Sequence, residues 1–202
     1  MKKLYVNIEK VKITGGPKEL YSLINITDMS LKNMSEKTKK MIEFLSKYSE
    51  SNKGIQFEKL INSTILLRDD LSDASYEIND MLIQVVKFVN KLNQYEDSNE
   101  TLPLPEQYTI PKCYVSSDVR SFQFGYDEML EVERECRTFR EDIYLSIKNV
   151  NTKKNNIASI WMDPQYDDYS DFIQDITSKI VTALKAYDEY LQYLDSKIKG
   201  MR

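Results

Sequence analysis

Apolar residues recur at alternating intervals of three and four positions along most of this 202-residue chain, which is the spacing of an amphipathic helix. The clearest such stripe comprises Leu60, Thr64, Leu67, Leu71, Ala74, Ile78, Met81, Val85 and Phe88. A seven-residue repeat held for about four heptads predicts a coiled-coil-like packing seam. Looser stripes over residues 18–51, 119–157 and 169–198 predict three further helices.

The first half of the chain contains signals that predict where its helices end. Residues 51–54 stop the first helix, with Gly54 at the left-handed position that follows a helix end. Residues 96–112 hold three prolines and four acidic residues without any period, which predicts a linker. Residues 4–13 alternate loosely and fit either a short N-terminal strand or a first helical turn.

The second half has signals for where its helices begin. Residues 116–118 offer Ser and Asp caps, from which a third helix is expected to run to about residue 157. Asp163 followed by Pro164 predicts the start of the last helix, with Asp as N-cap and Pro in the first helical position.

The two halves align with each other at an offset of 109 residues. The offset places Gln56-Phe57 on Gln165-Tyr166 and brings the second and fourth stripes into register. Any two heptad helices align in steps of seven, which explains the stripes but not the shared Gln-aromatic pair. The alignment favours a tandem repeat, with a first helical hairpin at residues 1–95, a linker at 96–112 and a second hairpin at 113–202.

These elements predict an all-α protein built from two tandem antiparallel hairpins. Each hairpin alone is a thin unit that leaves an apolar face in water. The halves are expected to pack together as a four-helix bundle, or to form an elongated coiled-coil arrangement in which each half pairs with another protein's hairpin.

The composition excludes several classes of chemistry. The chain has no histidine, which removes His-based catalytic triads, His metal sites and ordinary His acid–base catalysis. No nucleophile, cofactor or metal motif is present, so neither an enzyme nor a cofactor or metal protein is expected. The net charge of −4 comes without a basic stripe, which argues against nucleic-acid binding.

Cysteine usage and hydropathy bear on the compartment. Cys113 and Cys136 show neither zinc-ligand spacing nor a disulfide framework, so two free thiols are expected, although the sequence does not say whether either has a role. No stretch is apolar enough to span a membrane, and the N-terminal residues lack the apolar core of a Sec signal peptide. The protein is expected in the cytoplasm, or exported by a route without a Sec signal.

The turn between the last two helices holds the one tryptophan of the chain. Trp161 either plugs the end of the bundle or is exposed for a partner to grip, since Trp is enriched among interface anchors. On the second interpretation, the partner-binding residues are Trp161, Met162, Asp163, Tyr166 and Tyr169. The nearby acids Asp167 and Asp168 are best explained as a charged first turn that complements the helix dipole.

Residues 113–202 resemble the helical hairpins of the WXG (ESAT-like) superfamily, which are substrates and partners of bacterial type VII secretion. Those proteins join two antiparallel helices through a Trp-x-Gly turn. Trp161-Met162-Asp163 matches in position and order but has Asp163 in place of glycine. The equivalent residues of the first half, Asn52-Lys53-Gly54, keep the glycine and lose the tryptophan. The tyrosine-based export signal of secreted members is missing after the last helix.

The leading hypothesis is a non-enzymatic, WXG-like protein–protein interaction module that acts as a partner, adaptor or effector of type VII secretion. A fused double hairpin of this kind mimics the dimer that such proteins form, so a monomer or homodimer is expected. It would contact a protein partner through its helix faces or through the Trp161 turn. The alternative is a structural coiled-coil subunit of a larger assembly.

Overall fold

Four long helices carry almost all the regular structure of the computed structural model, which describes residues 11–120, 123 and 125–200. The helices are α1 (Tyr21–Ser49), α2 (Ile55–Tyr95), α3 (Tyr126–Asn156) and α4 (Pro164–Lys199), and a short 3-10 turn, η2 (Pro17–Leu20), leads into α1. The prediction of an all-α fold is confirmed.

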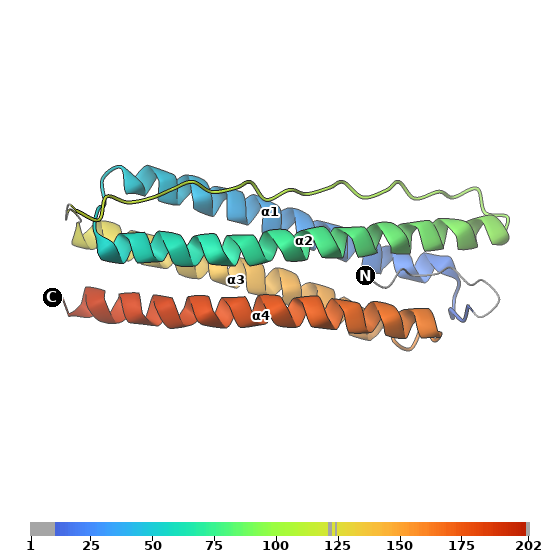
Figure 1. Cartoon of the computed structure of the whole chain (residues 1–202). Helices are drawn as coiled ribbons and strands as arrows, with labels where there is room; N and C mark the ends of the chain where they lie inside the picture. The colour runs from blue at the N-terminus through green and yellow to red at the C-terminus, as the bar shows by residue number, and fades with distance from the viewer. Residues whose placement is uncertain (1–10, 121–122, 124, 201–202) are drawn as a thin grey trace.

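The helices form a four-helix bundle in which each one runs antiparallel to its two neighbours (Figure 1). Helix α1 packs against α2 and α3, and α4 packs against the same two helices. The two hairpins therefore lie side by side in opposite directions, and each covers the apolar face of the other.

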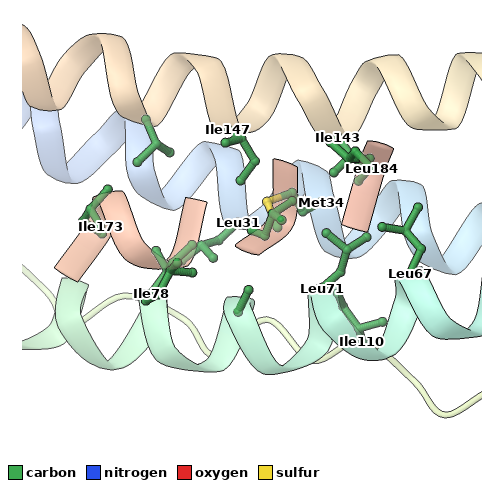
Figure 2. Packing of buried hydrophobic residues seen from close by; sticks show 14 of the residues in the cluster. Leu31, Met34, Leu67, Leu71, Ile78, Ile110, Ile143, Ile147, Ile173 and Leu184 are labelled. Atoms are coloured by element: carbon green, nitrogen blue, oxygen red, sulfur yellow. The ribbon is translucent and has the colours of Figure 1, made fainter. Parts of the chain in front are cut away.

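The predicted stripes form the core of this bundle. Every residue of the clearest stripe, from Leu60 to Phe88, is buried. Figure 2 shows how Ile78 and Leu71 of α2, Ile173 and Leu184 of α4, and Ile143 of α3 point into the shared interior. Complete burial of one such side chain contributes about 1.5–3 kcal/mol, so the apolar period is the main source of stability.

Helix α1 ends at Ser49, close to its predicted stop, but the predicted role of Gly54 and the predicted start of the third helix are wrong. Gly54 does not follow α1 in a left-handed cap; it precedes α2 as its N-cap, with φ 126° and ψ 167°. The third helix does not begin after residues 116–118, because α3 starts at Tyr126 behind Gly125. The reason is a tertiary contact: the Ser117 amide donates to Glu58 Oε2 at 2.5 Å, which holds this segment extended against α2.

The expected linker is an ordered strap. Residues 98–117, called the strap below, run the length of the bundle along α1 and α2 (Figure 1). The Asn90 side chain forms two hydrogen bonds with the main chain of Leu102, at 2.7 and 2.8 Å. Arg68 donates to the carbonyls of Ile110 and Pro111 at 3.0 and 2.7 Å. Ile110 is buried beside α2, so the strap adds to the core as well as joining the halves (Figure 2).

Contacts between α1 and α3 repeat at the offset of 109 residues seen in the sequence. Asn33 donates to Ser146 Oγ at 2.8 Å, and Lys37 pairs with Asp142 at 2.6 Å. At this offset Lys37 aligns with Ser146, and Asn33 aligns with Asp142. Exchanging the two halves therefore places each of the two contacts on the other. The bundle thus has an approximate two-fold relation between its hairpins.

The residues at the two hairpin turns extend this relation. Each turn pairs with the segment that precedes the first helix of the other half: Ile13 forms an isolated antiparallel bridge with Trp161, and Lys53 forms one with Gln123. Residues 4–13 were predicted as a short strand or a first helical turn; residues 4–10 lie outside the described residues, and within 11–13 only Ile13 forms a bridge.

Candidate protein-interaction site

Trp161 is the centre of a buried aromatic cluster at one end of the bundle. Its side chain has no exposed surface. The indole stacks on Phe88 at 5.3 Å and on Tyr169 at 5.8 Å between ring centroids, and Tyr166 meets it edge-on at 5.9 Å. Of the two alternatives predicted for Trp161, the structure agrees with the plug, and the exposed anchor for a partner is wrong in this structure.

Asp163 holds the turn together through three hydrogen bonds. One carboxylate oxygen accepts from the Gln165 amide at 2.9 Å, which caps α4 as the sequence predicted. The other accepts from Trp161 Nε1 at 2.9 Å and from the Lys12 amide at 3.2 Å. The Asp163 carboxylate therefore fixes the indole, the start of α4 and a segment of the first half in one place.

The other members of the predicted partner-binding set have different degrees of exposure. Met162 is the exposed one, at 41%. Tyr166 is half-buried and donates to the Lys154 carbonyl at 3.1 Å, and Tyr169 and Asp163 are buried. Burial also raises the pKa of Tyr169, so its phenol stays neutral. The structure brings all five residues together, but as a structural turn with one exposed side chain.

A groove between α1 and α3 opens next to this turn. Helix α1 lines it with Ile26, Met29, Ser30 and Asn33. Helix α3 lines it with Ser146, Asn149, Thr152, Lys153 and Asn156. The groove, called the α1/α3 groove below, has a volume of about 540 Å³, within the range typical of ligand sites. The end of α3 that forms it, at Asn156, leads directly into the Trp161 turn.

The α1/α3 groove has a counterpart on the other side of the two-fold relation. That counterpart pocket, about 270 Å³, is lined by Lys37, Lys40, Met41, Phe44, Glu135, Thr138, Phe139 and Asp142. Seven of these eight residues lie 109 positions from a residue of the α1/α3 groove, Met41 being the exception. The counterpart of Ser30 is Phe139 and that of Lys153 is Phe44, so two aromatic rings stand where the larger groove is hollow.

Charge also differs between the two pockets. The α1/α3 groove has one charged lining residue, Lys153, and its Asn33–Ser146 crossing is neutral. The counterpart pocket is crossed by the Lys37–Asp142 ion pair. Lys154, next to Lys153, points elsewhere: its ammonium donates to Gln174 at 2.9 Å, and burial lowers its pKa. The α1/α3 groove is therefore weakly positive and rich in amides and hydroxyls.

The groove was not predicted from the sequence. Its amides lie on two helices more than 100 residues apart, in polar positions between the apolar stripes, and such positions carry no periodic signal. One signal in the sequence could have indicated it. At the offset of 109 residues, three asparagines of the groove align with charged residues of the other half: Asn33 with Asp142, Asn149 with Lys40, and Asn156 with Lys47.

The described residues show little that points to other chemistry. No three Cys, Asp or Glu side chains within the described ranges are grouped closely enough to hold a metal ion. Cys136 is a buried free thiol whose pKa is raised to about 12 by burial, and Cys113 is a half-buried free thiol. Among the described helices, none has the length and apolar character needed to cross a bilayer.

A scan against protein-family models and searches of curated proteins and of solved structures each return no match.

Proposed function

We propose that this protein is a non-enzymatic helical interaction module that binds another protein, and that it is the single-chain counterpart of a dimer of helical hairpins. The observation that carries the proposal is the pair of equivalent α1–α3 contacts, Asn33–Ser146 and Lys37–Asp142. Two hairpins that exchange places under one operation pack as the subunits of a two-fold dimer do.

The resemblance of the Trp161 turn to the WXG pattern gives this module a setting in type VII secretion, as a partner or adaptor. The buried Trp161 supports a structural role for that residue, because its indole joins Asp163 and Phe88 in one cluster. Contact with a partner then falls to the exposed groups nearby, Met162 at the tip and the α1/α3 groove.

The alternative, a coiled-coil subunit of a large assembly, has less support from the packing. The long stripe of α2 is buried inside the bundle, and that of α4 is buried except at the half-buried Ala183 and Tyr190. A spacer that assembles through its seams would need one of them on the surface.

Light scattering and affinity capture test the proposal. The purified chain should run as a monomer of 23.8 kDa, and a stable large oligomer would favour the scaffold alternative. Tagged protein, produced at native level in its own cells, should enrich a defined protein over an unrelated helical bundle. Met162→Asp should reduce capture if the tip takes part, whereas Leu66→Asp, on an exposed position of α2, should not. Failure to enrich any protein would contradict the proposed function.

A further inference from the structure

The geometry points to the ligand class of the α1/α3 groove: an extended, acidic segment of a partner protein, held by hydrogen bonds to its main chain. This inference rests on the proposed function and names the partner's chemistry at one surface. Three features of the molecule support it: the way it holds its own strap, the side chains of the groove and the charge of the groove.

The strap shows that helix-borne side chains of this bundle bind an extended main chain. Asn90 donates to the Leu102 carbonyl and accepts from the Leu102 amide, as a neighbouring strand would. Asn93 donates to the Glu100 carbonyl at 3.1 Å, and Ser35 donates to the Thr109 carbonyl at 3.0 Å. These bonds use only the peptide groups of the strap and therefore tolerate many sequences.

The α1/α3 groove presents the same kinds of side chain. Asn149 and Asn156 are exposed along one edge, seven residues apart on α3, which is about 10 Å along a helix. About three residues of an extended chain span that distance, so the two amides can engage one segment. No hydrogen bond within the described part of the chain occupies either amide.

The positive charge of Lys153 favours extended segments that carry an acidic side chain. Lys153 is half-buried in the lining, no acidic side chain shares it, and none of the ion pairs of the described residues includes it. An acidic side chain of the ligand can pair with Lys153, while Met29, exposed at 69% on the rim, can cover an apolar one.

The counterpart pocket shows that these features are not an inevitable result of packing α1 against α3. At the equivalent positions, Phe44 and Phe139 narrow the pocket to about 270 Å³, and Lys37 and Asp142 neutralise each other. The same two helices thus form a larger, amide-rich groove at the Trp161 end and a smaller pocket narrowed by two aromatic rings at the other end.

A synthetic peptide with residues 98–111 of the strap is a suitable probe because it is acidic and contains three prolines, which stiffen it. The strap of the protein itself stays in place, because it is joined to the bundle at both ends and its Ile110 is buried. Titration of ¹⁵N-labelled full-length protein with this peptide should shift the amide signals of Asn33, Asn149, Lys153 and Asn156. A peptide with both glutamates changed to glutamine should bind about fivefold more weakly, and Lys153→Met should abolish that difference.

The variant Asn149→Leu/Asn156→Leu should weaken peptide binding by about tenfold or more. Its control is Lys40→Leu/Lys47→Leu, which places leucine at the two-fold equivalent positions and should leave the binding site of the peptide at the α1/α3 groove. The inference is overturned if the shifts map to the counterpart pocket or to the strap, if the double asparagine variant binds equally well, or if about 2 mM peptide causes no shift.

The same variants separate this inference from the proposed function. Unchanged capture of a protein partner by Asn149→Leu/Asn156→Leu would refute the groove assignment and leave the interaction module standing. Peptide binding at the groove, with no partner enriched from cells, would support the groove and refute the module.

Discussion

Replacement of Asp163 by alanine should destabilise the whole fold, because one carboxylate serves three donors from two halves of the chain. Its loss removes the N-cap of α4, which costs about 1 kcal/mol. It also leaves the buried Trp161 indole N–H without its acceptor, which costs about 1–3 kcal/mol. The part-buried Lys12 amide, at 3.2 Å, adds a smaller amount. The expected total is about 3 kcal/mol, a large share of the 5–15 kcal/mol typical of domains.

Urea unfolding measures this directly, since Trp161 is the one tryptophan and reports its own site. At about 2 kcal/mol per molar urea, the midpoint of Asp163→Ala should fall by about 1.5 M. Asp167→Ala is the matched control: it lies in the same first turn but is exposed, so it should cost about 0.5 kcal/mol or less. Equal stabilities of the two variants, within about 0.5 kcal/mol, would refute the account of Asp163 as the residue that joins the turn.

Four further predictions concern other residues of the bundle. Trp161 fluorescence should resist acrylamide in the native protein, and strong quenching would contradict its complete burial. Cys113 should react with a thiol reagent at pH 8, whereas Cys136, with its pKa raised to about 12, should react only after unfolding. A double-mutant cycle on Lys37–Asp142 should give up to about 1 kcal/mol that declines in 1 M salt, while a cycle on Asn33–Ser146 should be insensitive to salt. The free energy of unfolding should fall as the pH rises above 10. Burial raises the pKa of Tyr187 and Tyr190 in the folded protein, so these two phenols ionise at a lower pH in the unfolded chain. A free energy of unfolding that stays constant from pH 9 to 12 would contradict this.

Helix α4 shows how much of the fold follows from local sequence. Its start at Asp163-Pro164 is set by a cap and a fixed φ, and its stripe by the helical period, and both act within a few residues. The start of α3 was predicted wrongly from equally good local signals at residues 116–118. There the Ser117 amide bonds to Glu58 of a distant helix, and this contact overrides the caps.

Some features of the candidate site likewise follow from the sequence, and others depend on the tertiary structure. The sequence by itself determined the four amphipathic helices and the offset that relates the halves, because periodicity and caps are short-range properties of the chain. It also marked the turn from Trp161 to Tyr166 as a special segment. Only the tertiary structure decided that Trp161 is buried, since its stacking partner Phe88 belongs to the other hairpin.

The ordered conformation of the strap and the α1/α3 groove also depend on tertiary contacts. Asn90 and Leu102 meet because the strap runs back along α2, and Asn33 meets Ser146 because the two hairpins lie antiparallel. Each of these contacts joins polar residues whose order in the sequence has no period. Their position is set by the packing of the apolar stripes, so they become visible only when the bundle has formed.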